Sequence, residues 1–85
     1  MYEIVVTPHT VRDLKRLSRD VLRRIDRTIL KLRTDPRMRG SKHLRDYKHA
    51  DHRIRMGDYR ILFDIDDAQK TIIILRVGHR KDIYR

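Results

Sequence analysis

The chain has 85 residues, with 22 Lys and Arg against 12 Asp and Glu and a formal net charge of +10 at pH 7. This length fits a single domain, residues 1–85, with a small core. The absence of cysteine excludes disulfides and thiolate metal sites, and no apolar run is long enough to span a membrane. The N-terminal residues lack the basic start and cleavage site of a signal peptide. We therefore expect a soluble, cytoplasmic protein.

The positive charge predicts a polyanionic partner, which could be a nucleic acid, an anionic membrane surface or an acidic protein. A basic surface that serves only solubility, or adaptation to heat or salt, is the alternative. The chain has four Tyr, one Phe and no Trp. This low aromatic content argues against a stacking platform for single-stranded nucleic acid.

The first half of the chain predicts a strand followed by two helices. Residues 2–7 (YEIVVT) are rich in β-branched side chains and predict the strand. Thr7 as a cap and Pro8 as the first helical residue begin the first helix. The second helix is predicted over residues 19–34, and Asp35 before Pro36 ends it. Apolar residues recur at helical spacing in both: Val11, Leu14 and Leu17 in the first, and Leu22, Ile25, Ile29 and Leu32 in the second.

The second half of the chain predicts four strands, over residues 44–47, 52–56, 59–66 and 70–77. The fold class is therefore α+β: an N-terminal strand, a helical hairpin and then a four-stranded, mostly antiparallel sheet, in two layers. The first strand can pair in parallel with a later one across the helices. The expected core is Val5, Leu14, Leu17, Leu22, Ile25, Ile29, Ile54, Ile61, Phe63, Ile73 and Leu75.

The segment HRIRMGDYRIL predicts a hairpin with a two-residue type II′ turn at Gly57-Asp58. This turn sets Arg55 opposite Arg60, so that these two and Arg53 share one face. Ile54, Met56, Tyr59 and Ile61 share the other face. The register matters, because a slip of one residue would separate the arginines.

Like charges directly opposite each other destabilise a hairpin, so the arginine face predicts an anion site. Asp64 and Asp66 share the face of Arg60, and neutralisation by these acids is the alternative reading. Guanidinium groups bind phosphate through paired hydrogen bonds. On a sheet face they could hold a phosphodiester and stabilise the charge that builds up during its cleavage.

The C-terminal segment GHRKDIYR follows the last predicted strand and is expected at the rim of the sheet, beside the arginine face. His79 is either a surface histidine or a member of the site. Tyr84 is either a site residue or an apolar cover for the sheet edge. Arg80 and Lys81 add positive charge at the same rim.

The segments HRIRMGDYRILFDID and IIILRVGHRKDIYR together resemble the RelE toxins of the RelE/ParE toxin–antitoxin superfamily, and the likeness extends over essentially the whole chain. The resemblance implies a RelE-like two-layer fold and a ribosome-dependent mRNA endoribonuclease, or mRNA interferase, that needs no cofactor. Such an enzyme inhibits translation by cleaving mRNA in the ribosomal A site, through attack of the RNA 2′-hydroxyl. The catalytic positions implied are Arg53, Arg55, Arg60, Arg80 and Tyr84.

The resemblance leaves the general base open. Well-studied members of the family often carry lysine at the two strand positions that are Arg53 and Arg55 here, and arginine does not lose its proton. Either the arginines only polarise the 2′-hydroxyl and bind phosphate, or His79 acts as the base. His52 is two residues before Ile54 in the same predicted strand, so its side chain is expected on the same, core-facing side of the sheet. The remaining histidines match no catalytic pattern: His9, His43 and His49.

The implied partners are the ribosome, mRNA and a cognate antitoxin that wraps the toxin with an acidic extended segment and an amphipathic helix. Two alternatives remain for the function. One is a ParE-like gyrase inhibitor, a class that generally lacks the full set of basic and tyrosine residues found here. The other is a nucleic-acid-binding homologue without catalysis.

Overall fold

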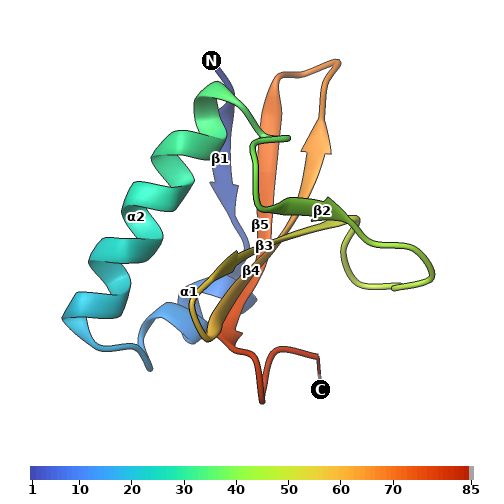
Figure 1. The fold of residues 1–85 in the computed structure, drawn as a ribbon. Helices are drawn as coiled ribbons and strands as arrows, with labels where there is room; N and C mark the ends of the chain where they lie inside the picture. The colour runs from blue at the N-terminus through green and yellow to red at the C-terminus, as the bar shows by residue number, and fades with distance from the viewer. Residues whose placement is uncertain (85) are drawn as a thin grey trace.

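A computed structural model describes residues 1–84 and contains two helices and one five-stranded sheet (Figure 1). The sheet order is β1-β5-β4-β3-β2, with β1 parallel to β5 and the other neighbours antiparallel. This arrangement confirms the α+β class and the parallel pairing of the first strand. The elements, in chain order, are β1 (Glu3–Val6), α1 (Pro8–Leu14), α2 (Arg19–Thr34), β2 (Ser41–His43), β3 (His52–Met56), β4 (Tyr59–Asp66) and β5 (Thr71–His79).

Both helices begin at the side-chain caps that their sequences provide. The Thr7 hydroxyl accepts the Thr10 N–H at 3.2 Å, and Pro8 is the first helical residue. The Ser18 hydroxyl caps α2 by accepting the Val21 N–H at 3.3 Å. Each cap satisfies a backbone donor that the first helical turn leaves without a partner.

The main core lies between α2 and one face of the sheet. Ile25 and Leu32 of α2 pack against buried side chains of β3, β4 and β5. The predicted core is confirmed for Ile25, Ile54, Ile61 and Phe63, and Leu14, Leu17 and Ile29 pack against it while partly buried. The buried members on the sheet are Ile54, Met56, Ile61, Phe63, Ile72, Ile74 and Val77.

The predicted core is wrong in β1 and β5, because the residues that face the main core are the neighbours of those predicted. Val5 is 47% exposed, and Ile4 packs on the core in its place. In β5, Ile72 and Ile74 face the helices, so Ile73 does not. The run from 72 to 75 is apolar throughout, and such a run carries no alternation from which its inward face can be deduced.

The fourth predicted element also differs, because β2 is Ser41–His43 and residues 44–47 are not a strand. Asp46 has a positive φ of 62°, which interrupts any extended run there. The segment after β2 instead covers the second face of the sheet. Leu44, Tyr47 and Ala50 pack on Leu62, beside Ile83 from the C-terminal turn.

No helix within residues 1–84 is both long and apolar enough to cross a membrane.

Candidate functional site

The β3–β4 hairpin has the predicted turn and register. Gly57 has a φ of +59°, while Asp58 is not in the left-handed region, as a type II′ turn requires. Arg55 pairs with Arg60, and Arg53 pairs with Leu62. The hairpin therefore holds Arg53, Arg55 and Arg60 on the sheet face that points away from α2, which we call the arginine face.

The Arg60 side chain is only 9% exposed, although it lies on the sheet face that points away from α2. Its Nη1 donates to the carbonyl oxygens of Gly57 and Tyr59, both at 2.9 Å. The guanidinium group thus folds back over the turn and holds it closed. It contributes to the hairpin's structure as well as to the positive charge of the face.

Arg53 and Arg55 complete the arginine face. Arg55 is exposed and Arg53 is half-buried. The pKa of Arg53 lies below its ordinary value, and burial is the largest cause. The positive charge of Arg55 lowers this pKa further, and Arg60 makes a smaller contribution. These neighbours make the face unfavourable for further positive charge and favourable for an anion.

Within residues 1–84, the acidic side chains Asp64 and Asp66 do not form ion pairs with the arginine face. The structure has no ion pair there between an acid and Arg53, Arg55 or Arg60. Asp64 Oδ1 accepts the Asp51 N–H at 2.8 Å and so holds the loop before β3. Asp66 Oδ1 accepts the Gln69 N–H at 3.1 Å in the β4–β5 turn. Both acids are occupied by backbone donors.

Arg80 and Tyr84 border the arginine face at the end of the sheet. The Arg80 N–H donates to the Asp58 carbonyl at 2.7 Å, and its Nε lies 3.7 Å from Asp58 Oδ1. Both contacts hold Arg80 beside the turn that Arg60 also contacts. Tyr84 is exposed, follows the buried Ile83 and lies near Arg53.

Tyr47 is a neighbour of the site that the sequence reasoning missed. Its ring meets that of Tyr84 edge to face, with centroids 5.5 Å apart. The only indication in the sequence is an aromatic residue within a basic loop, which does not reveal its position in space.

His79 does not lie beside the arginine face, so that expectation is wrong. It pairs with Tyr59 across β4 and β5, and the two rings are 5.4 Å apart, edge to face. Tyr59 packs on the main core, so His79 lies on the helix side of the sheet. Its Nδ1 accepts the Lys81 N–H at 3.1 Å. The cause is strand alternation, because Gly78 takes the position opposite Arg60.

His52 lies on the core side, as its parity predicts. Its ring centroid is 5.4 Å from that of Phe63 and 5.1 Å from that of His43. Burial, and then the neighbouring His43, lowers the pKa of His52. Residues 1–84 contain no group of three or more His, Cys, Asp or Glu side chains that could hold a metal ion.

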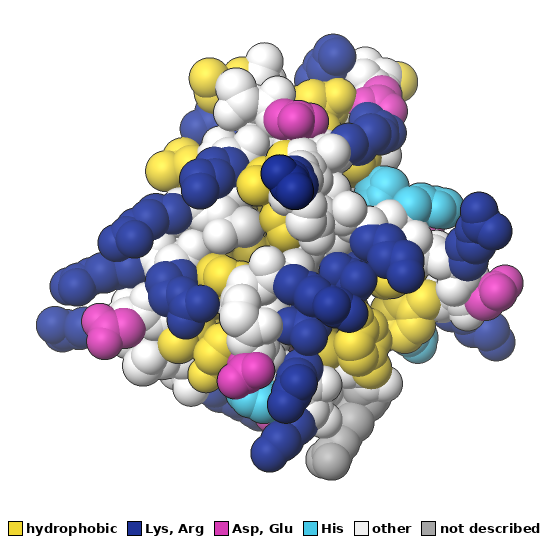
Figure 2. All heavy atoms as spheres, viewed as in Figure 1, with side chains coloured by type: hydrophobic (Ala, Val, Ile, Leu, Met, Phe, Trp, Pro, Cys, Tyr) yellow, Lys and Arg dark blue, Asp and Glu magenta, His cyan; other side chains and the backbone are white. Residues whose placement is uncertain are grey.

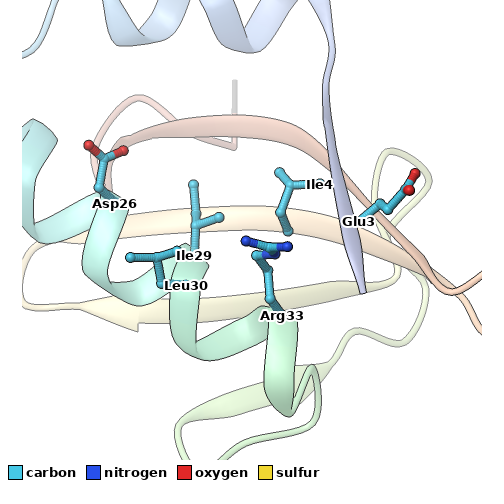
Figure 3. A pocket seen from close by; sticks show the side chains of 6 residues that line it. All are labelled: Glu3, Ile4, Asp26, Ile29, Leu30 and Arg33. Carbon is cyan, nitrogen blue, oxygen red and sulfur yellow. The ribbon is translucent and has the colours of Figure 1, made fainter. Parts of the chain in front are cut away.

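A separate groove of about 580 Å³ lies between β1 and α2 (Figure 3). Ile4, Ile29 and Leu30 supply its apolar surface, and Leu30 is 59% exposed. Charged residues border it: Glu3, Asp26 and Arg33. This groove is suited to an apolar side chain of a partner, whereas the arginine face is suited to phosphate.

Comparison with known proteins gives consistent results. The sequence profile described as ParE toxin of the type II toxin–antitoxin system parDE matches residues 4–84. The Mycobacterium tuberculosis toxin RelG is 38% identical over 85 residues, which is 99% of this chain and 97% of RelG.

Solved structures of toxin–antitoxin complexes share the fold. A chain of the toxin–antitoxin complex RelBE2 from Mycobacterium tuberculosis has a TM-score of 0.82 and 35% identity, covering 93% of this chain and 98% of that one. A chain of the archaeal RelE–RelB complex from Pyrococcus horikoshii has a TM-score of 0.80 and 26% identity, covering 95% and 97%. With a profile match over nearly the whole chain and these relatives, the protein belongs to the RelE/ParE superfamily and is a toxin of a type II toxin–antitoxin system.

Proposed function

We propose that this toxin is a ribosome-dependent endoribonuclease that cleaves mRNA in the A site and so inhibits translation. The observation that carries the proposal is the arginine face, on which Arg53, Arg55 and Arg60 stand together without an acidic partner within the described residues. Arg80 and Tyr84 border the same face. The relatives named RelG and RelE support the RelE branch of the superfamily.

In the proposed reaction the 2′-oxygen of the RNA attacks the adjacent phosphorus, and the bond to the 5′-oxygen breaks. The products are a 2′,3′-cyclic phosphate and a 5′-hydroxyl. Solvent water accepts the proton of the 2′-hydroxyl, and solvent water supplies the proton that the leaving 5′-oxygen gains. The arginines bind the non-bridging oxygens and stabilise the negative charge that develops on them. We assign to Tyr84, at the rim, a contact with the nucleotide.

The arginine face offers charge stabilisation without a histidine base, since His79 lies on the other side of the sheet. We therefore favour polarisation of the 2′-hydroxyl by the arginines over base catalysis by His79. Such a site depends on external positioning of the RNA, which alone can supply much of a barrier. The ribosomal A site is the proposed source of that positioning.

The test is 5′-end mapping of one transcript incubated with the toxin, with and without translating ribosomes. We expect cleavage only in the presence of ribosomes. Arg55→Ala should reduce the cleavage rate about 100-fold or more, as removal of a donor to developing charge does. His79→Ala is the matched control and should retain cleavage. Equal cutting of naked RNA would contradict the ribosome dependence, and a large loss in His79→Ala would restore histidine as the base.

We also propose an antitoxin partner, supported by the relatives solved as toxin–antitoxin complexes. The groove between β1 and α2 offers apolar anchor points of the kind that dominate protein affinity. Leu30→Asp should weaken capture of the antitoxin encoded beside this toxin, while Arg39→Asp, in the exposed loop before β2, should not. If both variants captured the antitoxin equally well, the groove would not be part of the antitoxin interface.

The ParE-type profile match favours one alternative, a gyrase inhibitor. DNA supercoiling by gyrase, measured with the same preparation, separates the two functions. Inhibition of supercoiling without cleavage on ribosomes would replace the proposed function with this alternative.

A further inference from the structure

The outer face of α2 carries a row of basic side chains. Arg19, Arg23, Arg27 and Lys31 follow one another at intervals of four residues, and all are exposed. Residues four apart are neighbours on a helix, so these side chains line one side of α2 over about 18 Å. We call this set the α2 row. Figure 2 shows basic side chains gathered along this side of the molecule.

The α2 row is poorly neutralised by the chain itself. Its ion pair within residues 1–84 joins Arg23 Nη1 to Asp20 Oδ1 at 3.9 Å, between two exposed side chains. Exposed pairs of this kind contribute little. Like charges four residues apart destabilise a helix, so the row opposes helix formation rather than supporting it. A partner of opposite charge would remove that repulsion.

Arg24 connects this side of α2 to the arginine face. A Cβ placed on Gly57 would lie 2.9 Å from Nη2 of Arg24, so the guanidinium group rests against the β3–β4 turn. Arg60 and Arg80 contact the same turn through Gly57 and Asp58. Positive charge therefore continues from the arginine face, around the turn, to α2.

We propose that the α2 row binds the phosphate backbone of double-helical RNA, as a second RNA surface on the side of the molecule opposite the arginine face. This inference rests on the proposed function and identifies how the toxin holds structured RNA on one side while the arginine face holds the substrate on the other. Residues 8–34 contain no Tyr, Phe or Trp, so the row offers phosphate contacts without base stacking. Contacts of this kind recognise double-stranded RNA by its shape and backbone.

The test compares two variants with the same net charge. Arg19→Gln/Arg23→Gln/Arg27→Gln removes three charges from the row, and glutamine preserves helix propensity. Arg39→Gln/Arg45→Gln/Lys48→Gln removes three exposed charges from the segment between α2 and β3. Fluorescence anisotropy measures binding to a 20-base-pair RNA duplex between 50 and 200 mM KCl, which requires no cleavage. Circular dichroism verifies that both variants keep their helices.

We expect the row variant to lose about 10-fold or more in affinity at 100 mM KCl. Its slope of log K against log salt should be shallower by about two to three, close to one unit for each lost phosphate contact. The loop variant should stay within about threefold of the original chain. Equal losses in both variants would mean that only net charge matters, and would overturn the proposal.

An acidic protein segment is the competing occupant, and a 20-residue Glu-rich peptide is its probe. If the row variant lost affinity for this peptide and kept its affinity for the duplex, the row would be a protein surface and the inference would be wrong. The cleavage assay reports separately on the proposed function. If the toxin cleaved no RNA but its duplex binding still depended on the α2 row, the proposed nuclease function would be wrong and the RNA-binding surface would stand.

Discussion

At the residue scale, the arginines of the hairpin differ in what they do for the fold. Arg60 is buried and bonded to two turn carbonyls through Nη1, whereas Arg55 is exposed. Within residues 1–84, the other side-chain N–H groups of Arg60 donate to no protein acceptor. One guanidinium group can therefore close the turn and still bind an anion, because its donors are fixed in a planar fork. A lysine has three donors on one small ammonium group and lacks this planar fork.

Arg60→Ala should lower both stability and activity. The substitution removes two hydrogen bonds from a charged donor, so we expect the free energy of unfolding to fall by about 1.5 to 3 kcal/mol. Urea denaturation measures this quantity. Arg55→Ala is the control, and its unfolding free energy should change by less than about 0.5 kcal/mol while cleavage is lost. Equal stability of the two variants would show that the turn does not need the Arg60 bonds.

At the element scale, a bulge in β5 is held by a buried carboxylate from α1. Leu62 pairs with Arg76 and Phe63 with Ile74, so Leu75 has no partner in β4. Asp13, whose side chain is 8% exposed, accepts the Val77 N–H at 3.0 Å and Arg76 Nε at 2.9 Å. The carboxylate thereby fixes where β5 resumes its pairing, just before the segment that carries Arg80. Bulges of this kind redirect a strand.

Asp13→Ala should destabilise the protein by about 3 kcal/mol, because it leaves the Arg76 charge and a buried N–H without their partner. Asp13→Asn should have a smaller effect, since the amide oxygen can still accept the Val77 N–H. The measurement is a double-mutant cycle of Asp13→Ala with Arg76→Ala in urea. A coupling energy near zero would mean that the pair does not hold the bulge.

The same elements show what the sequence could predict. The hairpin register was predictable because a Gly-Asp turn specifies it, together with alternation of polar and apolar residues in 53–56 and 59–61. The inward face of β5 was not, because its apolar run is uniform and the bulge depends on Asp13, more than sixty residues away. The placement of His79 failed because β5 continues through His79, and strand alternation turns that side chain to the helix side. Arg53, Arg55 and Arg60 were found together because local pairing alone brings them to one face.

At the scale of the whole molecule, one exposed carboxylate connects three distant segments. Asp67, in the β4–β5 turn, accepts the Tyr2 hydroxyl at 2.7 Å. It also accepts Arg37 Nη2 at 2.9 Å and Arg37 Nη1 at 3.3 Å. The hydrogen bonds from Arg37, and then the one from Tyr2, lower the pKa of Asp67 to about 2. The N-terminus, the loop after α2 and the sheet are joined at this point, far from the arginine face.

This link should make stability depend on acid pH in a defined window. The carboxyl has a pKa near 3.8 when unfolded and about 2 when folded, so the unfolded state binds more protons between these values. The stabilisation is complete above pH 3.8 and is lost as the pH falls toward 2. We expect Asp67→Asn to have a lower Tm than the original chain at pH 7, and the two Tm values to converge near pH 2.

Asp20→Asn removes one carboxylate from the surface of α2 and is the charge-matched control. Because Asp67 and Arg37 are exposed, 1 M salt should reduce the difference at pH 7. Tm curves of Asp67→Asn and the original chain that stay parallel from pH 5 to 2 would show that the link does not stabilise the fold.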